Sequence, residues 1–149
     1  MAEAFAAVGL AGNIIQFLDY GTILLLKGQE LYKSADGALK ENVEIEELAS
    51  EVKLLCQNLT SGTHYQFLGD ATSDHTVAIR KLAKTSHGLA EELLDVIKSL
   101  KIDKKKNKRL ESVKKSFQSV MKKDKIRDLE RRLGNIKEEV CLQLVVLLK

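Results

Sequence analysis

The side chains in this sequence best suited to chemistry are three histidines, two cysteines and a set of carboxylates. His64, His75 and His87 lie eleven and twelve residues apart, so no two share a helix turn, and with only Cys56 nearby they form no zinc-ligand pattern. The sequence also lacks a GxxxxGK[ST] phosphate loop, a GxSxG elbow and an HExxH pair. We therefore expect no enzyme activity, no metal and no cofactor.

The two cysteines, Cys56 and Cys141, lie within apolar helical patterns. Buried free thiols are favoured over a disulfide, because a chain of 149 residues can form a core without a covalent crosslink. The N-terminus begins with an acidic rather than a basic residue, Glu3, which argues against a secretory signal. The expected location is the cytosol.

The strongest charge pattern is a basic stretch in the second half of the chain. The net charge is only +3, yet the residues from Lys101 to Arg132 carry fourteen Lys or Arg against five Asp or Glu. Such clusters favour anionic lipid headgroups or an acidic partner. A solvated helix face is the alternative, and nucleic acid is not favoured because no aromatic side chains or binding motif accompany the charge. The candidate headgroup-binding residues are Lys101, Lys104, Lys105, Lys106, Lys108, Arg109, Lys114, Lys115, Lys122, Lys123 and Lys125.

The most unusual segment is the apolar N-terminus, residues 1–26, in which Asp19 is the only charge between Ala4 and Leu26. A membrane-spanning helix needs about 20 mainly apolar residues, and an acid at mid-membrane costs about 2.5–3.5 kcal/mol. Asp19 and its polar neighbours therefore favour a central helix buried by the rest of the protein in the resting state. A helix that is buried in one state and inserted into lipid in another is also compatible with this sequence.

Glycines occur at unusual density in this same segment. Gly9, Gly12, Gly21 and Gly28 each lower helix propensity by about 1 kcal/mol relative to Ala. They also let helix backbones approach closely, either inside a soluble bundle or between copies in lipid.

The elements that would position these residues are helices. The chain contains no proline, which permits long helices joined by short polar links. Apolar residues recur at steps of three and four in each long segment, which predicts an all-α fold, a single-domain bundle of four to five helices over residues 1–149. The expected elements are helices over 4–32, 38–59 and 74–100, a loop over 60–73, a basic connector and short helix over 101–125, and a last helix from about 124.

The segment from Ala4 to Gly21 (AFAAVGLAGNIIQFLDYG) resembles the N-terminal domain of fungal STAND proteins, the HeLo-like family. The resemblance continues through Lys27 to Ser34 (KGQELYKS) and returns in Arg127 to Leu133 (RDLERRL) and in Leu142 to Leu144 (LQL). It extends over essentially the whole chain, and the opening segment is its most specific part.

The resemblance implies a helical bundle that precedes a nucleotide-binding NACHT-type domain in receptors of fungal self/non-self recognition and cell death. The family is similar to the HeLo domain of heterokaryon-incompatibility proteins and to the four-helix bundle of the necroptosis pseudokinase. In these relatives activation promotes oligomerisation and exposes an apolar N-terminal helix that damages the plasma membrane. Carried over to this chain, the membrane-active residues would be Phe5, Val8, Leu10, Ile14, Ile15, Phe17 and Leu18, and Asp19 would line a pore or hold the resting state.

Two functional hypotheses follow. The first is a cell-death effector domain, cytoplasmic at rest and at the plasma membrane when activated, whose partners are anionic lipids, further copies of itself and a downstream nucleotide-binding domain. The second is a signalling adaptor that binds helices of a partner or of itself without touching lipid. It draws on the regular apolar spacing of the last helix and on the acidic segment from Glu44 to Glu51.

Overall fold

We analysed a computed structural model of the chain. It describes the backbone of residues 2–33, 39–70, 73–106 and 112–149, and the side chains of residues 2–30, 43–69, 73–100 and 123–149. All the regular secondary structure in these ranges is helical, which confirms the predicted all-α class.

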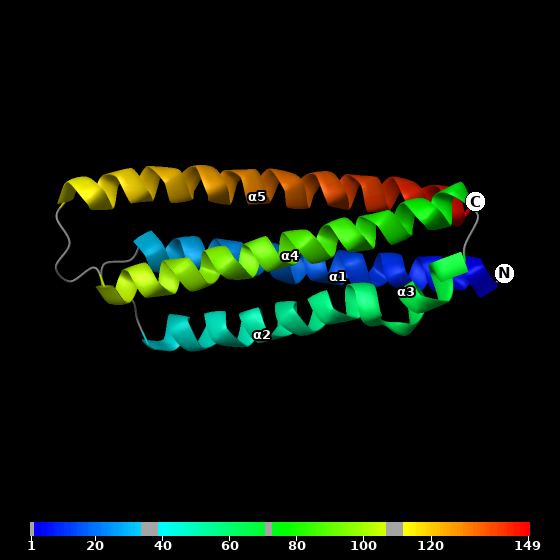
Figure 1. Ribbon diagram of the computed structural model, residues 1–149, viewed down its shortest axis with the longest axis horizontal. Helices are drawn as coiled ribbons and strands as arrows, with labels where there is room; N and C mark the ends of the chain where they lie inside the picture. Colours follow the sequence, from blue (N-terminus) through cyan, green and yellow to red (C-terminus); the bar gives the residue numbers. More distant parts are fainter. Residues whose placement is uncertain (1, 34–38, 71–72, 107–111) are drawn as a thin grey trace.

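Four long helices run alternately up and down the molecule. In chain order the elements are α1 (Ala2–Lys33), α2 (Leu39–Ser61), α3 (Thr63–Phe67), the 3-10 helix η1 (Leu68–Asp70), α4 (Asp74–Lys106) and α5 (Ser112–Leu147). In Figure 1, α1 and α4 lie between α2 and α5, which occupy opposite edges of the bundle. The N- and C-termini lie at the same end, next to α3.

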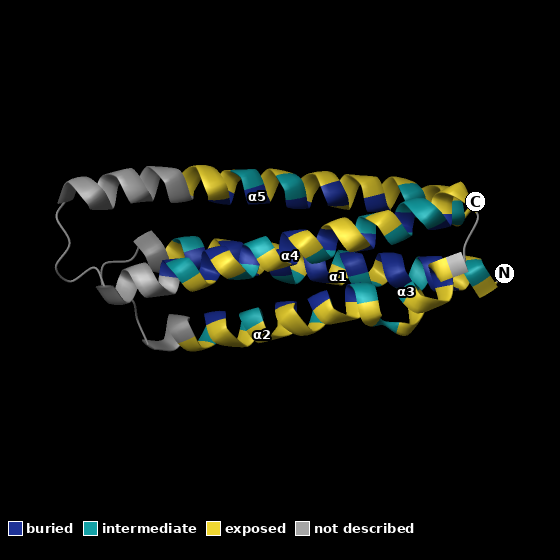
Figure 2. Cartoon of the chain, viewed as in Figure 1, coloured by how far each residue is buried: buried dark blue, intermediate teal, exposed yellow. Residues whose placement is uncertain are grey.

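The core is built from the apolar stripes that the sequence predicted. In α1, Ile14, Leu18 and Leu25 are buried, and Leu93 of α4 and Leu129 of α5 are buried with them. Figure 2 shows buried positions along the inner sides of the four long helices and exposed positions on their outer sides. At about 25 cal/mol per Å², burial of such stripes is the main force that holds helices with ordinary intrinsic propensity together.

Small residues bring the two central helices close together. Gly21 and Gly28 of α1 face α4, and a Cβ atom at Gly28 would lie 2.6 Å from Ile97 Cδ1. On α4, Ala83, Ser86 and Ala90 are fully buried. Because small side chains allow close packing of backbones, α1 and α4 touch along the short diagonal of the bundle while α2 and α5 lie apart.

Two segments differ from the sequence-based expectation. Residues 60–73, expected to be a loop, contain the end of α2 as well as α3 and η1. Gly62 links α2 to α3. Glycine suits this position because a Cβ atom there would collide with the Asn58 carbonyl oxygen. Leu68 is buried, so this connection contributes to the core. The helices α3 and η1 are too short to produce a recognisable helical period in the sequence.

Residues 112–147 form one helix, where the sequence led us to expect a short helix and a separate last helix from about Asp124. The segment from 112 to 133 contains neither Gly nor Pro. Lys, Arg, Gln, Met and Glu are good helix formers, so a run of charge does not interrupt a helix. The helix α4 likewise extends to Lys106, beyond the predicted end near Leu100.

Candidate functional site

Helix α1 is the candidate functional element. The span Ala2–Glu30 is long and apolar enough to cross a membrane, and it is the one helix with this property in the part of the chain that the structure describes. Buried core helices of soluble proteins meet the same criterion. What matters for function is therefore where its apolar side chains lie and what holds them there.

The seven predicted membrane-active residues do not share one face. Leu10, Ile14, Phe17 and Leu18 are buried in the core, and Val8 and Ile15 are half-buried. Phe5 differs from all of them, because 73% of its surface is exposed. In this conformation α1 presents Phe5 to solvent and keeps most of its other apolar side chains in the bundle.

Polar contacts hold the first half of α1 to its neighbours. Near its N-terminus, the buried Thr76 of α4 donates a hydrogen bond from Oγ1 to Glu3 Oε1 at 2.6 Å. Asp19 lies on the exposed side of α1 and pairs with Lys137 of α5, with 3.6 Å between Nζ and Oδ1. More than half of each of these two side chains is exposed, so the ion pair is a weak one.

The second half of α1 is held in a similar way. Lys27 pairs with Glu44 of α2 at 3.3 Å, and Gln29 Nε2 donates to Glu130 Oε1 of α5 at 3.4 Å. Together with Glu3 and Asp19, these residues link α1 to each of the other three long helices. Its release would break contacts at both ends as well as expose its core side chains.

The predicted lipid-binding residues fall mostly outside the described side chains. These are Lys101, Lys104, Lys105, Lys106, Lys108, Arg109, Lys114, Lys115 and Lys122. Lys123 and Lys125 are described, and both are exposed on α5.

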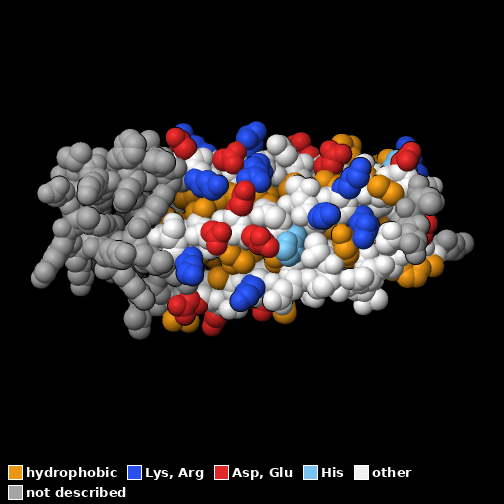
Figure 3. Space-filling view, viewed as in Figure 1, with side chains coloured by type: hydrophobic (Ala, Val, Ile, Leu, Met, Phe, Trp, Pro, Cys, Tyr) orange, Lys and Arg blue, Asp and Glu red, His pale blue; other side chains and the backbone are white. Residues whose placement is uncertain are grey.

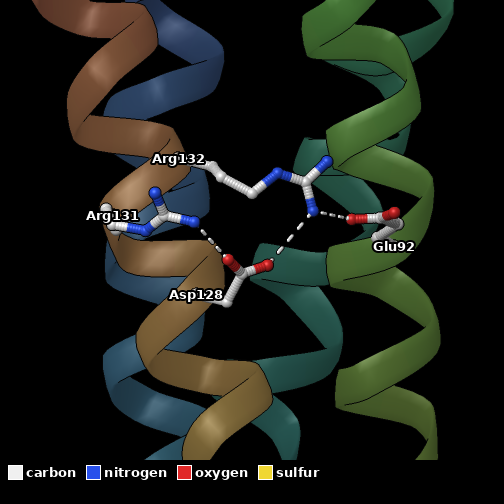
Figure 4. Close-up of polar contacts among 4 residues, drawn as sticks. All are labelled: Glu92, Asp128, Arg131 and Arg132. Atoms are coloured by element: carbon white, nitrogen blue, oxygen red, sulfur yellow. Dashed lines mark hydrogen bonds and ion pairs between the residues drawn. The ribbon is translucent and has the colours of Figure 1, made fainter.

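An ion-pair cluster joins α4 to α5. Arg132 of α5 contacts Glu92 of α4 and also Asp128 at 3.5 Å, while Arg131 donates to Asp128 at 2.7 Å (Figure 4). The hydrogen bond from Arg131 and the charges of both arginines hold the pKa of Asp128 below its ordinary value, although partial burial opposes this shift. The hydrogen bond to Glu92 raises the pKa of Arg132.

The cysteines and histidines have structural surroundings. Cys56 is buried between α2 and α4, where its thiol donates to the His87 carbonyl oxygen at 3.7 Å. Burial, reinforced by the charge of Glu91, raises the pKa of the Cys56 thiol. Cys141 is exposed, so the expectation that both thiols are buried is wrong for this one, which lies on the outer side of α5. Both thiols are free, as predicted.

The three histidines are dispersed. The ring of His64 covers Gly9, His75 Nδ1 lies 3.0 Å from Gln143 Oε1, and His87 lies 3.4 Å from Glu91. In the ranges whose side chains are described, no group of three potential ligands could hold a metal ion.

Exposed apolar side chains occur on three segments at the end of the bundle that carries both termini, namely the start of α1, α3 and the end of the chain. We call them the end set, which consists of Phe5, Phe67, Leu142, Val145, Val146 and Leu148, each between 43% and 73% exposed. Of these residues, only Phe5 was predicted from the sequence to have a functional role. The run Val145–Leu148 was a detectable signal, because consecutive apolar residues on a helix cannot all face one core.

A second feature that sequence reasoning missed is a groove between α1 and α2. Its volume is about 790 Å³, and its lining includes Ile23, Lys27, Val43, Glu47 and Glu51. The acidic segment was noted in the sequence, but its position beside the exposed Ile23 of α1 depends on helix packing.

Comparison of the chain with protein-family models, with curated proteins and with solved structures finds no significant match.

Proposed function

We propose that this chain is a cell-death effector domain that clusters on activation and permeabilises membranes through α1. In this proposal the folded bundle is the resting state, cytoplasmic and inactive, and activation releases α1 to the plasma membrane. The observation that carries the proposal is an N-terminal helix with the length and composition of a membrane span, held inside a soluble bundle. The resemblance of its opening segment to the HeLo-like family supports the same function.

The way α1 is held supports a resting state that can be opened. Two of its polar ties to neighbouring helices, Asp19–Lys137 and Lys27–Glu44, are ion pairs between side chains that are 41–58% exposed, so each is weak. The third is the part-buried hydrogen bond between Thr76 and Glu3. The larger barrier is burial of side chains such as Leu10 and Phe17. Insertion into lipid would rebury the same side chains, so anionic membrane and protein core compete for one apolar surface.

Dye release from vesicles with anionic headgroups tests the proposal, and the choice of variant decides what the result means. Deletion of residues 1–20 removes core side chains and would unfold the bundle, so loss of leakage would not be specific. Phe5 is better suited, because its side chain is 73% exposed and contributes little to the core. Phe5→Ser should leave the unfolding free energy unchanged and lower leakage by about tenfold or more, since a membrane-buried Phe contributes about 1.5–3 kcal/mol.

The matched control is Phe67→Ser on α3, which removes a ring of similar exposure, 57%, from outside α1. Leakage should be retained in this variant. A folded wild-type chain that releases no dye at any concentration, or equal loss in the two variants, would contradict the proposal.

A second candidate function is a signalling adaptor that binds helices of a partner or of itself without membrane activity. The observation in its favour is the end set, whose members on α5 lie outside the candidate membrane helix. Val145 and Val146 lie three and four residues after Leu142, so they share one face of α5 with it, and exposed apolar surface of this kind can mark an interaction site. Leu142→Ser together with Val145→Ser should abolish partner binding in the adaptor case and leave vesicle leakage intact in the effector case.

A further inference from the structure

The groove between α1 and α2 is lined by both apolar and acidic side chains. Ile23 of α1 and Val43 of α2 lie in it with 45% and 50% of their surface exposed. Glu47 and Glu51 line the α2 side, one helix turn apart. Within the described part of the chain neither carboxylate has a basic partner, and both are exposed. These two carboxylates are therefore available to a basic ligand from another molecule.

The combination selects a ligand with long basic side chains. Lys and Arg can lay their methylene stems on apolar surface while the charged ends reach carboxylates. Lys27 of α1 also lines the groove, and its ammonium group pairs with Glu44 at 3.3 Å. A helix that presents Lys or Arg at steps of four residues would extend the same contact along Glu47 and Glu51.

The chain carries such a helix on its other side. Lys123 and Arg127 of α5 are exposed and separated by four residues, the same spacing as Glu47 and Glu51 of α2. They belong to the stretch with fourteen basic against five acidic residues. Because α2 and α5 lie at opposite edges of the bundle, the acidic groove and the basic helix of one molecule do not face each other (Figure 1).

We propose that the α1–α2 groove is the docking site for α5 of a second copy of this chain, with Lys123 and Arg127 placed against Glu47 and Glu51. The interface is heterologous, because two different surfaces meet. Repetition of the contact therefore yields rings or open filaments rather than closed dimers. This inference rests on the clustering step of the proposed function and names its surface, and it is tested without membranes.

Charge exchange between copies is the decisive experiment. Sedimentation velocity of the full chain at low ionic strength should show concentration-dependent association that weakens strongly at high salt. Glu47→Lys/Glu51→Lys and Lys123→Glu/Arg127→Glu should each weaken association about tenfold or more. An equimolar mixture of the two variants should recover association, because each groove can then meet an α5 helix of opposite charge on the other variant.

Two control variants match these changes in net charge. Glu138→Lys/Glu139→Lys adds the same positive charge at exposed positions of α5, and Lys81→Glu/Lys84→Glu adds the same negative charge at exposed positions of α4. Both should associate like the wild type, and circular dichroism should show the same helix content for all variants. A wild type that stays monomeric, equal loss in the controls, or a mixture that stays dissociated would overturn the inference.

Dye release separates this inference from the proposed function. If the charge-reversed variants dissociate and their mixture associates, but the wild-type chain releases no dye, the proposed interface stands and the proposed membrane action is rejected. If the chain releases dye but its association is unaffected by the charge reversals, the proposed interface is rejected and the proposed membrane action stands.

Discussion

The two central helices, α1 and α4, occupy equivalent places in the bundle but differ on the sides that face outward. Both pack against α2 and α5 and against each other. The outer stripe of α4, defined by Lys81, Lys84, Gly88, Glu91, Asp95 and Lys98, has no apolar side chain beyond its glycine. Charged side chains of both signs are interspersed on the face of the bundle shown in Figure 3.

The outer stripe of α1, defined by Phe5, Gly12, Gln16, Asp19, Ile23, Leu26 and Glu30, is exposed at every position and mostly uncharged. The fold of α4 demonstrates that a central helix can have a fully polar outer side in this bundle. The exposed Ile23, Leu26 and Phe5 are therefore not required by the architecture, and this difference adds support to the function proposed for α1.

The inner faces of α1 and α4 should contribute equally to stability, and substitutions there should have the largest effect on the free energy of unfolding. Phe17→Ala in α1 and Leu93→Ala in α4 both remove fully buried side chains. Each should lower the free energy of unfolding, by about 3–5 and 2–5 kcal/mol respectively, in urea denaturation. A loss below about 1 kcal/mol for Phe17→Ala alone would mean that α1 is loosely held in solution.

A stabilising change is expected on the inner face of α4. Ser86 is fully buried, and its hydroxyl has no hydrogen-bond partner among the described residues. Ser86→Ala removes an unsatisfied polar group and improves helix propensity, so unfolding should cost about 1 kcal/mol more. Ser99→Ala is the comparison, because the Ser99 hydroxyl donates to the Val96 carbonyl oxygen at 3.1 Å and its loss should bring no such gain. A destabilised Ser86→Ala would show that the hydroxyl has a partner, such as a buried water.

The outer stripe of α1 should tolerate polar side chains with little effect on stability. Ile23→Gln and Leu26→Gln replace side chains that are 45% and 48% exposed, and each should change the unfolding free energy by no more than about 0.5 kcal/mol. The adjacent Leu25→Ala, at a buried position, should cost about 2–5 kcal/mol. If the two stripe variants unfold as easily as Leu25→Ala, the apolar stripe is structural and the contrast with α4 disappears.

The smallest effect is expected from the α4–α5 ion cluster, as a change in how the stability of the fold depends on pH in the acid range. Because the pKa of Asp128 is lowered in the folded chain, its contribution to stability is complete above the ordinary value of about 3.8. The contribution is lost as pH falls through the lower folded-state pKa. Arg131→Gln should therefore make the thermal midpoint fall less steeply below that pH. A variant with an unchanged acid profile would indicate that Arg132 alone sets the shift.

Much of the fold follows from the sequence. Absence of proline and regular apolar spacing predicted the long helices, and apolar residues at these steps, among them Leu59, Leu89 and Leu133, are buried. Residues 60–73 were misjudged because their short helices depend on docking of Leu68 rather than on periodicity. The helix break expected near Asp124 was wrong. A run of charged residues interrupts the apolar spacing in the same way as the end of a helix does, so the spacing alone cannot distinguish the two.

The candidate site was less accessible to sequence reasoning. A helix that is apolar on all sides has no distinct hydrophobic face, so nothing in its spacing separates the exposed Phe5 from the buried Leu10. The partners of Asp19 and Lys27 lie 118 and 17 residues away in the chain, and such pairs emerge only from packing. The position of the acidic segment beside Ile23 was hidden for the same reason.

The unequal surroundings of the two cysteines give the protein an internal measure of bundle opening. Alkylation requires a thiolate and physical access, and Cys56 lacks access while its pKa is raised. Exposed Cys141 reacts with the same reagent in the closed state and serves as the reference. The ratio of labelling at the two sites, followed by mass spectrometry on the native sequence, therefore reports the rate at which the α2–α4 seam separates, with or without lipid.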